Sequence, residues 1–251
     1  SAAPLTTELK AQAVALGFTR VGFIPAAPAR SLDAYLAWIA AGHHGEMGYM
    51  ARPDRVARRR DLDVILPGAR SVVVVGLDYA TAPLPPDIAA DPARGRFSNY
   101  AWGVDYHEEI TPRLEMVGEW LGKRAGGQGG RGTGETALRI PGEGAELTRP
   151  VGEGQTVQTR VYVDTGALLE RDHGQTAGLG FTGKNTLLID PRYGSWFFLG
   201  VLLTTLPLEY DAPPISTLSP TLAQRERGPS CGRCHRCLDA GPTAAFPAPY
   251  A

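Results

Sequence analysis

The stretch from Arg160 to Gly200 constrains the fold of this chain more than any other part of the sequence. It joins a strand, a helix, a glycine-punctuated loop and two more strands. β-Branched residues occupy alternate positions at its start, over 157–163, a period typical of a half-buried strand. The sequence therefore predicts a strand that brings Asp164 to the edge of a sheet.

Asp164 follows this strand directly. With Thr165 and Gly166 behind it, its carboxylate has the chemistry of a cap for a helix that begins over 167–170. On the residues alone, this structural role is the favoured interpretation of Asp164.

A loop rich in glycine follows the predicted helix and reads GLGFTGKN over 178–185. Gly180 lets the backbone approach another group closely, and Lys184 and Asn185 present a cation and an amide beside it. The spacing resembles a dinucleotide loop only superficially, because it follows a helix and precedes a strand, the reverse of the Rossmann order. A nucleotide site is therefore a weak prediction.

The remaining elements are read from periodicity and from capping residues. We expect an apolar strand buried on both faces over 71–76 and an interior strand over 195–203. The other expected elements are a helix capped by Thr6 or Thr7 that ends at Gly17, a strand over 18–24, a helix from Ser31, a loop over 80–95, a helix that starts or kinks at Thr111-Pro112, and a flexible glycine-rich insertion over 125–156.

Composition excludes few classes of protein. The 251 residues can bury one large core or two modest ones. Acidic and basic residues nearly cancel, to a net charge of −1, so contact with nucleic acid needs a local patch. The sequence shows no signal peptide pattern and no apolar run long enough to span a bilayer. We expect a cytoplasmic protein.

Five arginines between Arg52 and Arg60 make the densest basic cluster, and acidic residues dilute it. Composition favours a solvated helix face with local ion pairs, and a patch that contacts phosphate is the alternative.

Aromatic residues gather over 97–107, where Tyr100 and Trp102 belong either to the core or to a flat platform for a planar ligand.

All three cysteines lie in one short run, at Cys231, Cys234 and Cys237. The pattern C-x-x-C-x-x-C-x-x-x-G-P follows the bacterial ferredoxin run, except that Gly241 replaces the fourth cysteine. This layout suits an iron–sulfur cluster better than disulfides. A zinc site completed by His235, or three idle thiols, are the alternatives.

Taken in order, the motifs make the chain resemble the tRNA epoxyqueuosine reductases, cobalamin- and iron–sulfur-dependent enzymes of queuosine biosynthesis. The likeness runs from about residue 44 to residue 250. It rests on HGEMGYMAR, LPGARSVVVVGLDY, YAWGVDYH, VDTGALLER, AGLGFTGKNTLLI, GSWFFLG and CGRCHRCLDAGPTAAFPAPY.

The resemblance implies an α/β (α+β) fold, with a nitroreductase-like cobalamin-binding core over 1–210 and a ferredoxin-like segment over 211–251. The family's catalytic acid falls on Asp164, and His107 is a second candidate for proton delivery. The residues expected to bind cobalamin are Arg58, Tyr100, Trp102, Asp164, Gly180, Lys184 and Asn185. The expected cluster ligands are Cys231, Cys234 and Cys237.

The implied reaction is the reduction of epoxyqueuosine to queuosine in a tRNA anticodon stem-loop. The resemblance also implies an external electron donor, and we expect a monomer that does not bind membranes. An acid form of Asp164 enclosed beside an apolar corrin would suit general acid catalysis.

The chain departs from the family where the clusters are bound. Gly241 replaces a cysteine, and the sequence stops at Ala251 before the family's second cysteine run. We therefore expect a shortened homologue with at most one cluster, itself lacking a ligand. The alternatives are a non-catalytic cobalamin carrier of the same fold, a reductase resembling the reductive dehalogenases, and, ranked last, a structural zinc protein.

Overall fold

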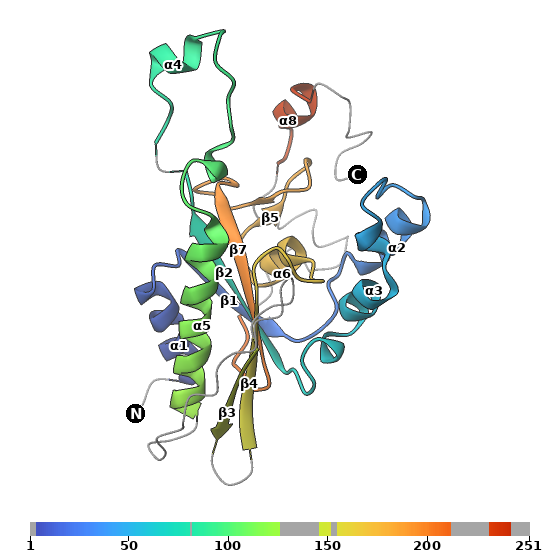
Figure 1. Ribbon diagram of the computed structural model, residues 1–251, viewed down its shortest axis with the longest axis vertical. Helices are drawn as coiled ribbons and strands as arrows, with labels where there is room; N and C mark the ends of the chain where they lie inside the picture. The colour runs from blue at the N-terminus through green and yellow to red at the C-terminus, as the bar shows by residue number, and fades with distance from the viewer. Residues whose placement is uncertain (1–3, 81, 126–145, 152–154, 212–230, 242–251) are drawn as a thin grey trace.

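The computed structural model describes residues 4–80, 82–125, 146–151, 155–211 and 231–241. A five-stranded sheet lies at the centre of these residues (Figure 1), in the order β1-β2-β7-β4-β3. Every neighbouring pair is antiparallel. The strands are β1 (Arg20–Pro25), β2 (Ser71–Asp78), β3 (Glu146–Val151), β4 (Gln155–Tyr162) and β7 (Phe197–Thr204).

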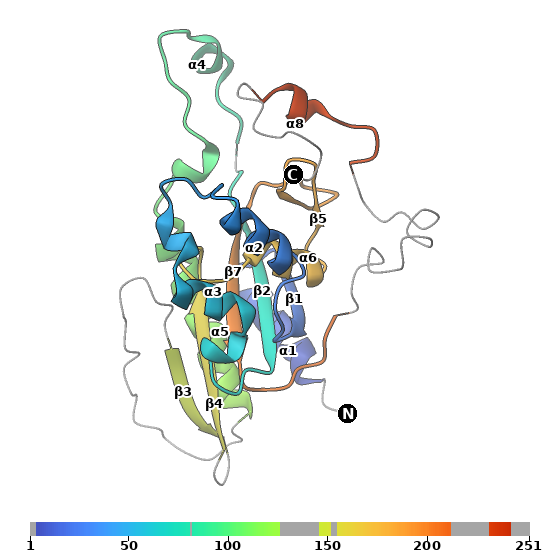
Figure 2. The same ribbon diagram turned by 90° about the vertical axis from the view of Figure 1, so that its right-hand side faces the viewer.

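Helices cover both faces of this sheet, as Figures 1 and 2 show. One face carries α1 (Leu5–Ala15) and α5 (Tyr106–Ala125), and the other carries α2 (Leu32–Ala40), α3 (Pro53–Arg60) and α6 (Glu170–Thr176). Two apolar clusters result, one for each face. The predicted α+β class is confirmed, with the sheet as the wall between two cores.

The valines of β2 explain why this strand is central. Val73 and Val75 belong to the core under α1 and α5, whereas Val72 and Val74 belong to the core on the α6 side. All four are completely buried, because successive side chains of a strand point to opposite faces and helices cover both. The prediction of a strand buried on both faces is confirmed.

Two glycines let helices lie close to the sheet. A Cβ atom on Gly22 would stand 2.3 Å from the carbonyl oxygen of Ala177, just after α6. On the other face, a Cβ atom on Gly200 would stand 2.6 Å from a methyl carbon of Leu114 in α5. Any larger residue at either position would push a helix away from its core.

Several predicted boundaries need correction. Pro4, not a threonine, stands at the N-cap of α1. Helix α5 begins at Tyr106 and contains Pro112 in its interior, because the cap comes from Asp105, whose Oδ1 accepts a hydrogen bond from the His107 amide at 2.9 Å. The predicted loop over 80–95 contains a short helix, α4 (Pro86–Ala90).

The glycine-rich insertion also needs correction. Its residues 126–145 and 152–154 lie outside the described residues, but 146–151 form β3 and pair with β4 in regular antiparallel register. Composition did not reveal this strand, because the strand is stabilised by its pairing with β4 and its own sequence has no regular alternation of apolar residues.

A short hairpin and a short helix lie toward one end of the sheet. β5 (Phe181–Thr182) and β6 (Leu188–Ile189) form a hairpin, and α8 (Arg236–Asp239) lies beyond it. Three 3₁₀ turns are η1 (Gly48–Ala51), η2 (Leu62–Val64) and η3 (Asn99–Ala101). Among the described helices, none combines the length and apolar character that crossing a membrane requires.

Candidate active site

Asp164 lies where β4 has ended, and its backbone adopts a left-handed conformation with φ of 61°. Few non-glycine residues adopt this conformation, and those that do often serve function. Its Oδ2 accepts a hydrogen bond of 2.6 Å from the hydroxyl of Tyr106. The predicted helix cap is wrong, because α6 begins only at Glu170 with Leu169 at its N-cap.

Tyr106 and His107, at the start of α5, complete this side of the site. The Tyr106 ring stacks on His107 and on Phe198, with ring centroids 4.2 and 4.3 Å apart. Burial, together with the hydrogen bond to Asp164, raises the pKa of Tyr106. Its hydroxyl therefore stays protonated and remains a donor to the Asp164 carboxyl group. His107 Nδ1 lies 2.7 Å from Asp105 Oδ1.

Glu170 is a second carboxyl group of the site that sequence reasoning missed. Its Oε1 is buried and has no hydrogen-bond partner among the described residues. Burial, aided by the negative charge of Asp164, raises the pKa of Glu170 to about 8. A glutamate at the first position of a helix is common, so only its buried surroundings mark it.

The arginine cluster divides into buried and exposed members. Arg59 is only 8% exposed, and its guanidinium lies 4.7 Å from the ring centre of Tyr35. Arg55 donates to the Thr165 carbonyl oxygen at 3.0 Å, next to Asp164. The solvated-face interpretation, which composition alone favoured, is therefore wrong for Arg59, whereas Arg55 is half-buried. Arg58, in the same helix, is half-buried.

Tyr100 and Trp102 do not belong to the core. Their exposed fractions are 51% and 41%, which overturns the interpretation of this aromatic group as core packing. The indole N–H of Trp102 donates to the Phe97 carbonyl oxygen at 3.0 Å. The two residues stand on η3 and directly after it, a few residues before Tyr106.

The glycine-rich loop lies on the β5-β6 hairpin and is engaged within the protein. A Cβ atom on Gly180 would stand 2.5 Å from the Ile189 carbonyl oxygen, so the close approach at Gly180 is to β6. The side chain of Asn185 accepts a hydrogen bond of 3.2 Å from the Leu187 amide. Asn185 thereby stabilises its own turn.

Lys184 ties the hairpin to the cysteine segment. Its Nζ donates to the carbonyl oxygens of Gly232 and Cys234, both at 2.9 Å. Its backbone amide donates a hydrogen bond to the sulfur of Cys231 at 3.4 Å. Sequence reasoning named Lys184 and these cysteines separately, and the structure brings them together.

The three cysteines are free thiols, and Cys234 is exposed. Within the described ranges, no three cysteine, histidine or acidic residues lie close enough together to hold a metal ion. The assignment of Cys231, Cys234 and Cys237 to an iron–sulfur cluster therefore stays a prediction, and we derive no chemical step through a cluster.

Fold and site together define an α+β protein with a tyrosine-bonded aspartate at the end of a strand. The family model described as "Epoxyqueuosine reductase QueG, DUF1730" matches residues 59–136. The epoxyqueuosine reductase of Gloeobacter violaceus is 38% identical over 252 residues, which cover 98% of this chain and 62% of that protein. The epoxyqueuosine reductase of Synechocystis is 36% identical over 213 residues, or 85% of this chain and 57% of that protein.

Solved structures agree. An epoxyqueuosine reductase crystallised with a tRNA-Tyr epoxyqueuosine-modified stem loop superposes with a TM-score of 0.69 at 27% identity, covering 98% of this chain and 53% of that one. The Streptococcus thermophilus enzyme also gives 0.69, at 25% identity, and covers 96% and 53%. The resemblance is confirmed: the chain is similar to the epoxyqueuosine reductases over most of its own length, and it spans between half and two thirds of theirs.

Proposed function

We propose that this chain is the core of a reductase that converts epoxyqueuosine to queuosine in tRNA, with Asp164 as proton donor. One observation carries the proposal: Asp164, in the VDT motif, sits in a left-handed conformation with its carboxylate held by the Tyr106 hydroxyl at 2.6 Å. The relatives that share this sequence and fold are named for that reaction, and one was crystallised with the modified RNA.

The residues around Asp164 fit cobalamin as the cofactor. Three buried polar atoms, Glu170 Oε1, Arg59 Nε and His107 Nε2, have no hydrogen-bond partner among the described residues. Buried polar groups without partners are rare, and the amides that fringe a corrin ring offer both donors and acceptors to them. Arg58 and Tyr100 remain further candidates for holding the cofactor, whereas Gly180, Lys184 and Asn185 would act through the hairpin.

Reduction of an epoxide to an alkene consumes two electrons and two protons and releases the oxygen as water. Cobalamin, when bound, supplies the electron chemistry. The departing oxygen needs the protons, and a positioned carboxylic acid provides one of them. Asp164 is that acid. Tyr106 fixes the carboxyl group in place, and His107, stacked on Tyr106, is the candidate for the second proton.

The irregular backbone around Asp164 suits a catalytic loop. Residues 163–169 form neither helix nor strand, and Arg55 holds the segment through the Thr165 carbonyl oxygen. An epoxyqueuosine reductase from Bacillus subtilis, 26% identical to this chain, has been solved with its catalytic aspartate loop swung out of the active site. We expect the 163–169 segment to change position in the same way, with Arg55 stabilising the inward position.

A single-turnover assay without oxygen tests the proposal. Protein loaded with cobalamin and reduced chemically, so that no natural electron donor is needed, is mixed with an epoxyqueuosine-containing stem-loop, and queuosine is quantified. We expect product from the wild type and a rate at least about 100-fold lower for Asp164→Asn, because general acids contribute that much or more.

The control for this assay is Asp33→Asn, the same change at an exposed position on α2. Its rate should equal that of the wild type. Cobalamin binding without any product from the wild type would contradict the proposed reaction and favour a carrier of the cofactor. An undiminished rate in Asp164→Asn would remove Asp164 from the mechanism.

A further inference from the structure

Between β2 and α5 the chain makes an excursion over residues 79–105 that carries α4 well away from the sheet (Figure 1). Residues of this excursion line a cavity of about 450 Å³, within the size range of ligand pockets. Its walls come only from this excursion: Leu84, Ile88, Arg94, Gly95, Arg96, Phe97, Ala101 and Trp102.

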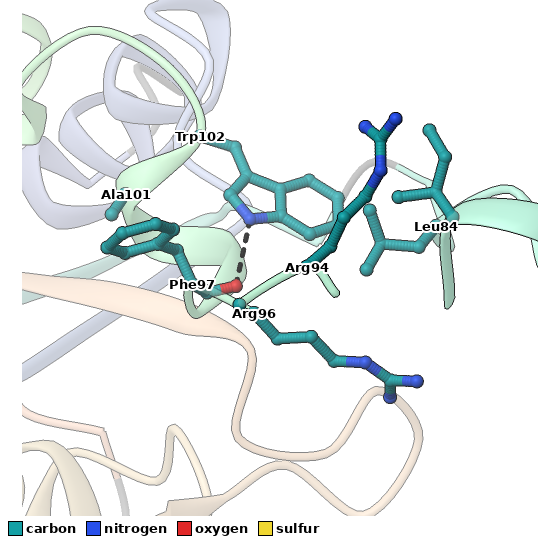
Figure 3. Close-up of a pocket in the computed structure, with 8 residues that line it drawn as sticks. Leu84, Arg94, Arg96, Phe97, Ala101 and Trp102 are labelled. Atoms are coloured by element: carbon teal, nitrogen blue, oxygen red, sulfur yellow. Dashed lines mark hydrogen bonds between the residues drawn. The ribbon is translucent and has the colours of Figure 1, made fainter. Parts of the chain in front are cut away.

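The aromatic rings of this cavity are offered to solvent. Phe97 is 80% exposed and Trp102 is 41% exposed, although rings of this size are usually buried. Figure 3 shows the indole of Trp102 between the Phe97 ring and the Arg94 side chain. Its N–H is already bonded to the Phe97 carbonyl oxygen, so the faces of the indole, and not its polar edge, are free for a ligand. Flat rings with free faces bind planar partners by stacking.

Two cations flank these rings. Arg94 Nε pairs with Asp91 at 3.0 Å, and Arg96 donates to the carbonyl oxygen of Ala89. Both arginines lie at the surface, and each guanidinium carries five N–H donors in a planar fork that matches phosphate oxygens. The internal bonds therefore orient the two arginines and leave donors for an anion. Stacking faces beside surface arginines are the features with which proteins hold single-stranded nucleic acid.

The cavity lies near the candidate catalytic centre. Trp102 precedes Tyr106 by four residues, and four residues of fully extended chain span at most about 14 Å. Tyr106 in turn bonds Asp164. A strand of RNA whose modified nucleoside reached Asp164 would bring a nearby nucleotide within reach of Trp102.

We propose that this cavity binds one unstacked base and the adjoining phosphate of the RNA that carries the modified nucleoside. The base stacks on Trp102 and Phe97, and Arg94 and Arg96 contact the phosphate. This inference rests on the proposed function for the identity of the RNA. It adds a site for a flanking nucleotide, formed by residues of the excursion.

A nucleotide tail of cobalamin would offer the same chemistry, a planar base on a ribose phosphate. The test must therefore separate the two sources. Two measurements do so. One is the binding of RNA in the complete absence of cobalamin. The other compares the binding of cobalamin with that of cobinamide, which lacks the nucleotide tail. The RNA assignment requires the cavity variants to weaken RNA binding and to leave the preference for cobalamin over cobinamide unchanged.

The experiment measures the affinity of the cobalamin-free protein for a labelled anticodon stem-loop, with 2-aminopurine placed in turn at each loop position that flanks the modified one. We expect Trp102→Ala to weaken binding about 5- to 150-fold, the range for loss of one stacked base, and to abolish the fluorescence change at one position. Trp102→Phe, which keeps a stacking face, should restore most of both. Arg96→Ala should lower the salt slope by about 0.7, as for one phosphate of a single strand.

The matched control is Arg192→Ala, an exposed arginine on the turn after β6, which should leave affinity and salt slope unchanged. Wild-type affinity and an unaltered 2-aminopurine signal in Trp102→Ala would overturn the inference. So would a lost preference for cobalamin over cobinamide, which assigns the cavity to the cofactor tail. Because these readouts need no turnover, failure of the proposed reaction would show separately, as RNA binding without product.

Discussion

Tyr106 contacts two distant segments of the chain. Its hydroxyl bonds Asp164, which lies 58 residues further along the sequence, and its ring stacks on Phe198. Tyr106→Phe should keep the stacking and lose only the hydrogen bond. A hydrogen bond to a neutral group contributes about 0.5–1.5 kcal/mol, so we expect the single-turnover rate to fall about 2- to 13-fold.

Tyr79→Phe is the control for that variant. Tyr79 packs against the same Phe198 ring in a tilted arrangement, with 4.5 Å between centroids, and no hydrogen bond joins it to Asp164 in the structure as described. Its rate should match the wild type. Equal rates for all three proteins would show that the Tyr106 hydroxyl does not position the acid.

The raised pKa of Glu170 predicts how the free energy of unfolding depends on pH. Its pKa rises from 4.5 to about 8 on folding, so the folded state binds a proton that the unfolded state has released between these values. The free energy of unfolding should therefore decrease as the pH rises from about 4.5 to 8, by as much as about 1.4 kcal/mol per unit. Glu170→Gln, which cannot ionise, should remove this decrease.

Urea unfolding at a series of pH values between 5 and 9 measures this effect. The two proteins should have similar stabilities near pH 5 and differ most above pH 8, where Glu170 of the folded wild type has ionised. Parallel stability curves for the two proteins would mean that Glu170 ionises as easily in the folded state as in the unfolded one.

Among the elements, α2 depends on α6 for its N-terminal cap. Ser31 occupies the N-cap position of α2 but makes no capping bond with its own side chain. Instead, the carboxylate of Asp172 in α6 accepts bonds from the Ser31 amide at 2.7 Å and the Arg30 amide at 3.2 Å. This contact joins the two helices on the Asp164 side of the sheet.

Asp172→Ala should therefore destabilise the protein by about 0.5–2 kcal/mol, the usual effect of losing a cap. Asp172→Asn keeps an acceptor oxygen and should lose much less. Urea unfolding at pH 7 measures both. If the alanine variant were as stable as the asparagine variant, the bonds to Arg30 and Ser31 would not contribute to stability.

For the whole molecule, Arg20 connects the main sheet to the turn after β6. Its Nε lies 2.9 Å from Asp190 Oδ2, with both side chains 7% exposed, and its guanidinium also pairs with Asp78 and stacks on Phe197 at 4.3 Å. Breaking a buried pair by removing one partner costs about 3–5 kcal/mol. We expect a loss of that size for Arg20→Ala in urea unfolding, against little change for the exposed Arg192→Ala.

The same ion pair predicts an acid-sensitive fold. Burial alone would raise the pKa of Asp190, but bonds from the Arg192 amide and the Arg20 side chain hold that pKa below its usual 3.8. Such a group adds stability above pH 3.8 that is lost as the pH falls through the folded pKa. Unfolding between pH 5 and pH 2 should show this loss in the wild type and a smaller one in Asp190→Asn.

Much of the fold was predictable from local pattern. The run of valines over 71–76 predicts a strand buried on both faces, and the alternation over 157–163 predicts a strand buried on one face. In both cases the spacing of the buried residues is a local property of the strand. The motifs around Asp164 and the cysteines likewise carried the family resemblance without any structure. These features are local, so the sequence by itself determined the fold class, the central strands and the candidate acid.

Only the tertiary structure decided which groups meet. Tyr106 bonds Asp164, Asp172 caps α2 from 141 residues away, and Lys184 donates to the cysteine segment. The burial that raises the pKa of Glu170 and the exposure of Trp102 are equally outcomes of packing. Hydrogen bonds and desolvation depend on distances in space, which a local pattern does not contain. For that reason the sequence named the candidate acid, and the folded chain supplied the partners that surround it.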